Sequence, residues 1–322
     1  MPSTITHSYF SVDVYNKLNN KYKKNININK LKVFAQGPDI YYFYNFLIGK
    51  KAKKIYNIGD ILHKDNIDTY FYNIIKYIKD NNLYDNTEIK SYLYGIICHY
   101  ILDTNLHPYI IYHTGIYNKN IKETLKYNGK HQEMEYYLDC YMIDKYEKIN
   151  HKTYKMYKIL NINLDNSLKD LINNTNKKTY NIDNTFYYYK KSLKYMYLFF
   201  KYINYDKYKI KRKIYKIIDK ILNNHFIKLE ELSYHIEDYE YLKYLNNNKN
   251  TWNHPSTNKE YNYSFNELYN ISIDKCIDTI IKVDNLISKN NINKKEIFKL
   301  FNLSYIAGLN YKDKDNLKYF KY

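Results

Sequence analysis

Three side chains that commonly bind metal ions recur at four-residue spacing in the segment YGIICHYILDTNLHPY. They are His99, Asp103 and His107. Residues four apart lie on one face of an α-helix, so we expect these side chains to form a ladder along one helix. Imidazole nitrogen and carboxylate oxygen are natural zinc ligands. The spacing therefore predicts that this helix contributes to a zinc site.

His131 and Glu135, in the segment HQEME, repeat the spacing. A buried histidine is more often a hydrogen-bonded core residue than a ligand, and one isolated His-x3-Asp pair is weak evidence for a site. Several such pairs within apolar segments favour a metal, because imidazole and carboxylate groups are costly to bury without a partner. Cys98 points about 100° away from His99 on a helix, so we expect it to lie outside the site.

The elements that must position these residues are predicted to be helices, because apolar residues recur every three or four positions, as in FYNIIKYIKD. Thr87 and Ser264 are candidate N-caps, and Glu267 completes a capping box with Ser264. Strand-like alternation is scarce, so the expected fold class is all-α. The predicted helices span 8–22, 38–46, 69–81, 87–112, 130–148, 167–173, 185–203, 207–223, 233–245, 264–289 and 294–301.

Two asparagine-rich segments, 163–185 and 246–262, interrupt the chain. We expect residues 1–150 to form a helical metal-binding catalytic core and residues 151–322 to form a helical C-terminal region packed on it. The histidines support this division, because six of the ten precede Glu135. His235 and His254 are expected to be solvated or capping residues.

The chain of 322 residues carries 51 Lys and Arg against 33 Asp and Glu, a formal net charge of +18. The excess of Tyr, Asn, Lys and Ile runs through the whole sequence, so we interpret it first as a compositional bias. The positive field would still attract anionic substrates, nucleic acid or an anionic membrane surface. The sequence contains no Walker loop, glycine-rich dinucleotide motif or CxxC pair, which argues against those chemistries.

The first residues, MPSTITHSYFSVDVY, contain no basic stretch followed by an apolar core. No apolar run approaches the roughly 20 residues of a spanning helix. We therefore expect a cytoplasmic protein without a transmembrane segment. The three cysteines, Cys98, Cys140 and Cys276, are expected to be reduced, buried thiols.

A family resemblance emerges from the order of the motifs. His7, Asp39 in FAQGPD, His63 in GDILHK, then HYILDTNLH and HQEME, resemble the zinc-dependent phospholipase C family, whose wider fold group includes single-strand nucleases. The motifs cover roughly residues 1–150. The segments TWNHP, SFNELY and LSYIAGL look like recurring tail elements of relatives. The resemblance implies a multi-helix bundle with up to three Zn²⁺ ions.

By resemblance, the ligands divide into three sets. The first zinc would be held by Asp39, His63, His99 and Asp103, the second by Asp103 and His7, and the third by His107, His131 and Glu135. The implied reaction is phosphate ester hydrolysis by a metal-bound hydroxide, with Asp39 acting as ligand and as orienter or base.

The sequence departs from the family pattern in two places. Three residues, rather than five, separate Asp103 from His107, so the third zinc could instead use His113. The family completes its second zinc with an N-terminal tryptophan, whereas the only tryptophan here is Trp252. Removal of Met1 would leave the imino group and carbonyl of Pro2 as a replacement ligand; a disordered terminus and an incompletely occupied cluster are the alternatives.

The expected substrate is a phosphate ester: a phospholipid, a soluble head-group ester or a nucleotide. Aromatic residues 41–44 could stack a base or enclose a choline-like cation, although a core role is expected for them. The alternative functions are a single-strand nuclease or 3′-nucleotidase, and a non-enzymatic, zinc-stabilised basic helical module that binds nucleic acid or membrane.

Overall fold

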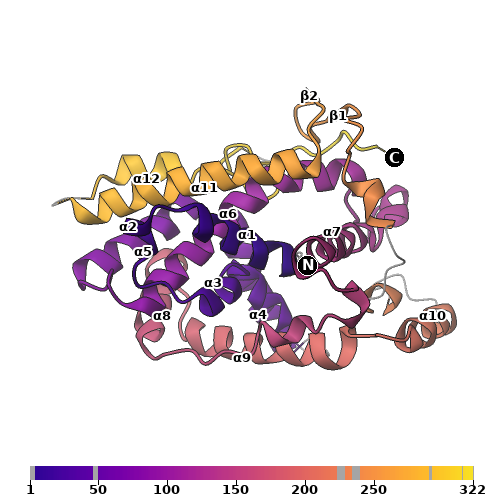
Figure 1. Ribbon diagram of the computed structural model, residues 1–322, viewed down its shortest axis with the longest axis horizontal. Helices are drawn as coiled ribbons and strands as arrows, with labels where there is room; N and C mark the ends of the chain where they lie inside the picture. Colours follow the sequence, from indigo (N-terminus) through magenta and orange to yellow (C-terminus); the bar gives the residue numbers. More distant parts are fainter. Residues whose placement is uncertain are drawn as a thin grey trace.

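A computed structural model describes residues 4–45, 50–222, 229–233, 240–289, 292–313 and 315–321. It confirms the all-α prediction (Figure 1). The α-helices are α1 (Thr4–Lys17), α2 (Asn20–Lys23), α3 (Ile28–Phe34), α4 (Lys50–Lys64), α5 (Ile67–Asp80), α6 (Thr87–Thr114), α7 (Lys130–Glu147), α8 (Ser167–Tyr180), α9 (Thr185–Leu198), α10 (Ile210–Leu222), α11 (Phe265–Ser288) and α12 (Lys294–Leu300).

Short 3-10 helices connect them: η1 (Gly37–Phe43), η2 (Lys122–Tyr127), η3 (His151–Thr153), η4 (Met156–Lys158), η6 (Leu229–Leu232) and η7 (Glu240–Tyr244). A π-helical turn, η5 (Phe199–Asn204), follows α9. Within the described ranges, strand pairing is limited to the antiparallel hairpin β1 (Trp252–Asn253) and β2 (Glu260–Tyr261) and one bridge between Leu303 and Asn310. No helix among the described residues has the length and apolar character to cross a bilayer.

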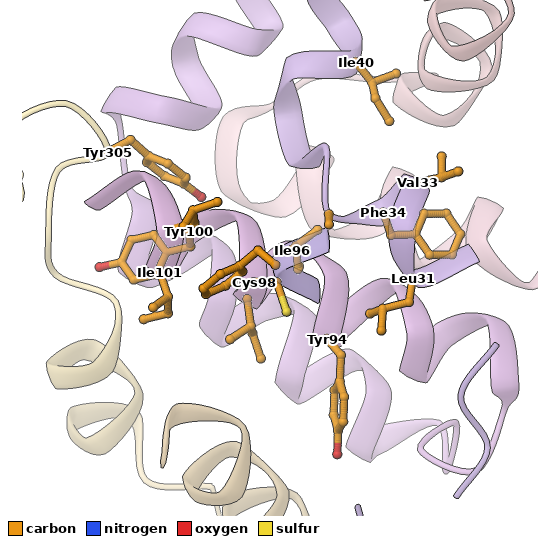
Figure 2. Close-up of a cluster of buried hydrophobic side chains, with 14 of the residues drawn as sticks. Leu31, Val33, Phe34, Ile40, Tyr94, Ile96, Cys98, Tyr100, Ile101 and Tyr305 are labelled. Carbon is orange, nitrogen blue, oxygen red and sulfur yellow. The ribbon is translucent and has the colours of Figure 1, made fainter. Parts of the chain in front are cut away.

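Helix α6 forms the centre of the molecule. It packs against α1, α3, α7 and α11, and its side chains are buried around nearly its whole circumference. Figure 2 shows Tyr94, Ile96 and Tyr100 of α6 in a cluster that also includes Leu31 and Phe34 of α3. A helix enclosed on all sides has little freedom to move, so α6 is a rigid support for the three ligand-type residues along it.

The sequence predicts Cys98 to be a core residue, and the structure confirms this. All three cysteines are buried, and none is in a disulfide. The Cys98 Sγ lies 3.7 Å from the Sγ of Cys276 on α11.

Pro108 lies inside α6, where it offers no N–H to the carbonyl of Thr104. The C-terminal segment packs on that carbonyl at Gly308, which has a φ of +63°. A Cβ atom at position 308 would overlap the Thr104 oxygen. Glycine therefore allows the segment 301–311 to lie directly against α6, between the ligand-type residues.

Most long helices agree closely with the predicted ranges, and the capping box of Ser264 and Glu267 is confirmed. Several details are corrected. Helix α6 is capped by Asn86, not Thr87, because the Asn86 side chain accepts the N–H groups of Glu88 and Ile89. Helix α8 continues to Tyr180 because burial against α5 outweighs the weak helix propensity of its asparagines.

Other expected ranges change type or boundaries. The helix expected over 8–22 begins at Thr4 and is divided into α1 and α2. The range 38–46 is the 3-10 helix η1 in its described part, and 185–203 ends in the π-turn η5. Of the range 233–245, residues 234–239 lie outside the described residues.

Helices α3 and α4 were not predicted. In α4, apolar residues at helical spacing face the core, including Ile55, Ile58 and Leu62. The lysine-rich start of α4 and Gly59 obscure this periodicity in the sequence.

Residues from both predicted regions contribute to one hydrophobic core. Helix α11 packs along α6, α8 packs on α5, and α9 packs on η1. The C-terminal residues therefore help to fix the elements that carry the site. The proposed division at residue 150 stays a prediction.

Candidate metal centre

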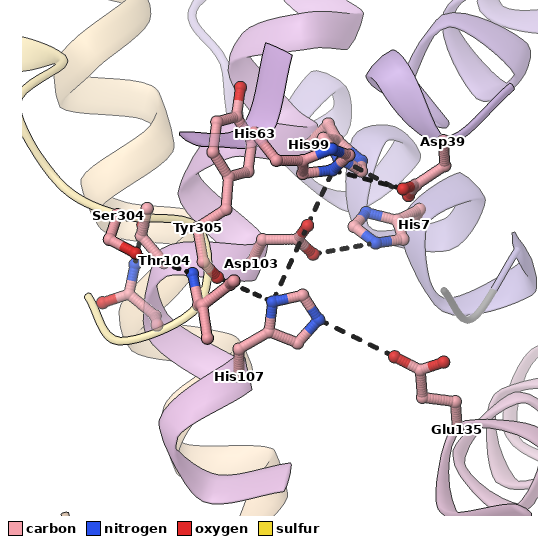
Figure 3. Close-up of polar contacts among 12 residues, drawn as sticks. His7, Asp39, His63, His99, Asp103, Thr104, His107, Glu135, Ser304 and Tyr305 are labelled. Atoms are coloured by element: carbon pink, nitrogen blue, oxygen red, sulfur yellow. Dashed lines mark hydrogen bonds and ion pairs between the residues drawn. The ribbon is translucent and has the colours of Figure 1, made fainter. Parts of the chain in front are cut away.

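Ligand-type side chains converge at two places in the described structure. The first group is His7, Asp39, His99 and Asp103, and the second is His107, His131 and Glu135. Within each group, one potential ligand atom per residue lies within 4.8 Å of the others. The two groups adjoin, because His107 of the second lies near Asp103 of the first along α6; Figure 3 shows these two residues, with Glu135 facing His107.

His63 adjoins the first group. Its Nε2 lies 3.2 Å from Asp39 Oδ1 and 3.5 Å from His99 Nε2. The structure thus brings together all eight of the predicted side-chain ligands, while Pro2 lies outside the described residues. They arrive on five elements: α1 (His7), η1 (Asp39), α4 (His63), α6 (His99, Asp103, His107) and α7 (His131, Glu135).

Asp139 of α7 places the beginning of α1. Its carboxylate accepts hydrogen bonds from the backbone N–H groups of Ile5, at 3.1 Å, and Thr6, at 2.7 Å, and from the Thr6 hydroxyl, at 2.9 Å. A carboxylate at a helix N-terminus satisfies unpaired N–H groups and complements the helix dipole. His7, the next residue, then reaches Asp103 Oδ1 with its Nε2 at 3.1 Å. Asp139 was not predicted as a site residue, although it continues the four-residue spacing beyond Glu135.

Three histidines share one hydrogen-bonding pattern. The Nδ1 atoms of His63, His99 and His107 lie 2.7, 3.1 and 2.6 Å from the backbone carbonyls of Gly59, Ala35 and Tyr305, respectively. A carbonyl can only accept, so each Nδ1 carries the proton. The Nε2 atoms are directed toward carboxylates, and a histidine oriented in this way is prepared to bind a metal through Nε2.

The close contact between η1 and α6 depends on Gly37. Its φ is +52°, and a Cβ atom there would overlap the ring of His99. This glycine lets the chain turn sharply between Ala35 and Asp39. The Ala35 carbonyl accepts a hydrogen bond from His99 Nδ1, and the Asp39 carboxylate faces His99 Nε2.

The contacts of His99 provide a test of whether a cation fits the site. Burial lowers the pKa of His99 to about 4, so its Nε2 is an unprotonated acceptor at neutral pH. That Nε2 lies 3.2 Å from Asp103 Oδ2 and 3.5 Å from Asp39 Oδ2, which are also acceptors. Acceptors this close repel one another unless a cation lies among them.

Buried site atoms without a hydrogen-bond partner also indicate that a cation fits the site. Among the described residues, four buried site atoms have no hydrogen-bond partner: His7 Nδ1, Asp39 Oδ2, Asp103 Oδ2 and Glu135 Oε2. Burying carboxylate oxygen without a partner is costly. Nitrogen and oxygen donors in this number fit zinc.

The charges of the centre are strongly coupled. Burial acts against the charged form of Asp103, but the neighbouring His107, His99 and His7 outweigh it and lower the pKa of Asp103 far below its usual range. Burial also opposes protonation of His107, yet Asp103 and Glu135 raise its pKa to about 9. Without a metal, His107 is therefore protonated at neutral pH. Zinc would have to displace that proton in order to bind, so zinc and protons compete for the centre.

The C-terminal segment 301–311 completes the centre. The backbone carbonyl of Tyr305 accepts the hydrogen bond from His107 Nδ1. The ring of Tyr305 lies 4.8 Å from that of His63 and 5.7 Å from that of His99. His254 fixes this segment, because its Nε2 donates to the Ala307 carbonyl at 2.9 Å. His254 is thus buried rather than solvated, and its Nδ1 accepts the backbone N–H groups of Ser256 and Thr257, which agrees with the capping role that was the other expectation. Tyr305 lies in the LSYIAGL segment and His254 in TWNHP, but their roles were not predicted.

His113 and most of the aromatic run 41–44, which were also candidate site residues, lie outside the two ligand groups. His113 packs against Tyr109 and Tyr112 and belongs to neither described ligand group. In the aromatic run 41–44, Tyr41, Phe43 and Tyr44 are core residues, as expected. Tyr42 instead donates a hydrogen bond to Asp60 at 3.0 Å and lies 3.3 Å from His63 Nδ1.

Access to the centre differs between its two groups. The side chains of His107 and His131 are 15% and 30% exposed, whereas that of His99 is fully buried. A substrate would therefore approach from the second group.

An all-α bundle around buried histidine and carboxylate donors is typical of a metalloprotein, and this donor set suits zinc. Residues 6–229, more than half of the chain, match the profile of the family described as zinc dependent phospholipase C. The chain belongs to this family and is a zinc-dependent phosphodiesterase. All eight side-chain ligand candidates lie within the matched residues, whereas Tyr305 and His254 lie beyond them. Comparison with curated proteins and with solved structures gives no match.

Proposed function

We propose that the centre hydrolyses the phosphodiester bond that links the head group of a phospholipid to its diacylglycerol, with up to three zinc ions bound. The observation that carries the proposal is the approach of His99 Nε2 to Asp103 Oδ2, at 3.2 Å, and Asp39 Oδ2, at 3.5 Å, while His99 Nδ1 faces the Ala35 carbonyl. When bound, zinc lowers the pKa of a water molecule toward neutrality and offsets the negative charge of the phosphate group.

The assignment of the ions follows the family resemblance, and the proximity of the residues is consistent with it. The first would be held by Asp39, His63, His99 and Asp103, the second by Asp103 and His7, and the third by His107, His131 and Glu135. The distance of 3.1 Å between His7 Nε2 and Asp103 Oδ1 supports the sharing of Asp103 by two ions. Pro2 remains the proposed additional ligand of the second ion.

Asp39 is the proposed base. Its Oδ1 faces His63, and its buried Oδ2 has no hydrogen-bond partner among the described residues. With one carboxylate oxygen on the first ion, the other would orient a water molecule and take up the proton that the water loses. His107 and His131, the more exposed ligands, lie where a phosphate group would enter.

A phospholipid is favoured over a nucleic acid by the family match; the aromatic run 41–44 does not distinguish them, because its burial excludes a stacked base and an enclosed choline-like cation alike. Three of those four aromatic side chains are buried in the core and present no face to a base. We propose a cytoplasmic location, where the substrate would be internal lipid. The three buried cysteines form no disulfide among the described residues, which is consistent with a reducing compartment.

The test is turnover by zinc-loaded protein on phosphatidylcholine, single-stranded DNA and a nucleoside 3′-phosphate. We expect diacylglycerol release, and we expect Asp39→Asn to reduce it by about 100-fold or more through loss of the base. The matched control is Asp170→Asn, which changes an exposed carboxylate on α8. Preferred cleavage of DNA would support the nuclease alternative, and zinc binding without any turnover would support the non-enzymatic one.

A further inference from the structure

Helix α10 exposes its apolar face to solvent. Ile210, Ile214, Ile217 and Ile221 are 58%, 49%, 58% and 75% exposed. They are spaced by four, three and four residues, so they form one continuous stripe along the helix. A soluble protein normally buries such a stripe, and an exposed one marks an interaction site.

The opposite side of α10 is attached to the protein by polar contacts. Asp219 accepts the backbone N–H groups of Leu229 and Glu230, both at 2.9 Å. Arg212 Nε lies 3.2 Å from Glu230 Oε1, and the hydroxyl of Tyr215 donates to the Ile203 carbonyl at 3.3 Å. Polar groups thus fix which face of α10 points inward, and the isoleucine stripe is held outward.

Positive charge borders the stripe. Helix α10 contains five basic residues and one acidic residue. Lys213, Lys216 and Lys220 are exposed and lie together on one flank of the isoleucines. Just before the helix, Tyr208 is 70% exposed. An apolar stripe, flanking lysines and an exposed tyrosine are the composition of helices that lie in the interface of a membrane.

The position of α10 suits contact with a flat surface. Figure 1 shows it at one end of the long axis of the molecule, opposite the end that carries α12. A bilayer could therefore meet α10 without displacing the helices around the metal centre.

We infer that α10 is a docking helix for an anionic phospholipid surface, with the isoleucine stripe inserted at the boundary of the head groups and acyl chains. Charge complementarity identifies this partner. Contact between the stripes of two copies of the chain would bring their lysines together, and a nucleic acid would leave the isoleucines exposed. The inference goes beyond the proposed function, because surface binding requires no turnover at the metal centre.

The test is co-sedimentation of the full-length, zinc-loaded protein with vesicles of phosphatidylcholine containing phosphatidylserine. We expect the wild type to bind and the Ile214→Asn/Ile217→Asn variant to bind about ten-fold or more weakly, through loss of apolar area. The matched control is Ile121→Asn/Ile149→Asn, which alters two isoleucines that are 46% and 44% exposed outside α10. It should bind like the wild type.

A second variant examines the charge. Lys213→Gln/Lys216→Gln/Lys220→Gln should weaken binding to phosphatidylserine vesicles by at least about ten-fold and leave binding to pure phosphatidylcholine unchanged. Equal vesicle binding by the wild type and the isoleucine variant would overturn the inference. So would a wild-type dimer that the isoleucine variant converts to a monomer, without vesicle binding.

Turnover of the water-soluble ester p-nitrophenylphosphorylcholine separates this inference from the proposed function. The isoleucine variant should retain that turnover while losing vesicle binding. If the wild type cleaves neither this ester nor phosphatidylcholine but binds vesicles through the stripe, the proposed function fails and the docking surface stands.

Discussion

At the scale of single residues, Asp139 shows how a ligand is placed by a residue that binds no metal itself. Its carboxylate is fully buried and accepts two backbone N–H groups at the start of α1. His7 follows directly and reaches Asp103. The position of His7 therefore depends on a carboxylate more than 130 residues away in the sequence.

We predict that Asp139→Asn destabilises the protein by about 1–3 kcal/mol, because an amide replaces a charged acceptor of three hydrogen bonds. Zinc affinity should fall by about ten-fold through the displacement of His7. Urea unfolding and zinc titration measure the two effects. Asp144→Asn is the control, since Asp144 lies on α7 but contacts His151 instead of α1. Unchanged zinc affinity in Asp139→Asn would exclude the positioning role.

At the scale of elements, the sequence predicted the positions of helices more reliably than the contacts that the helices make with distant segments. Helices α6 and α7 were predictable because they are long and periodic, and their four-residue spacing correctly brings the ligand candidates onto common faces. The role of Tyr305 was not predictable, because its contact with His107 joins residues 198 positions apart. The isoleucine spacing of α10 predicts a helix but not which way the stripe faces; that direction is set by Asp219 and Arg212.

The contact between α6 and the C-terminal segment leads to a prediction at position 308. Gly308→Ala should destabilise the protein by at least about 1 kcal/mol, because φ is +63° and the added Cβ would overlap the Thr104 carbonyl. Displacement of the segment should also remove the Tyr305 carbonyl from His107 and so weaken zinc binding. Zinc titration and thermal unfolding are the measurements. Lys318→Ala, an exposed change near the C-terminus, should have neither effect.

At the scale of the whole molecule, a single core joins the metal-binding helices to the C-terminal helices, so local protonation can affect global stability. His113 is a partly buried example on α6, outside the ligand groups. Burial, together with Lys321, lowers its pKa from 6.5 to about 4. The unfolded chain therefore binds the proton more readily than the folded protein does.

The sign of the pH effect follows. The free energy of unfolding associated with neutral His113 is fully present above pH 6.5 and is lost as the pH falls toward 4. The complete loss amounts to about 3 kcal/mol. We predict that wild type loses more stability than His113→Phe when the pH is lowered from 7 to 5, as measured by urea unfolding. The comparison between the proteins separates this effect from protonation of the metal ligands. An equal loss of unfolding free energy in the wild type and in His113→Phe would contradict this role of His113.

The central claim is that eight side chains from five elements form a zinc centre. Anomalous diffraction at the zinc absorption edge, from crystals of zinc-loaded protein, tests it most directly. We predict anomalous peaks within the group of His7, Asp39, His99 and Asp103 and within the group of His107, His131 and Glu135. Peaks only at other positions, or none at either group, would contradict the account.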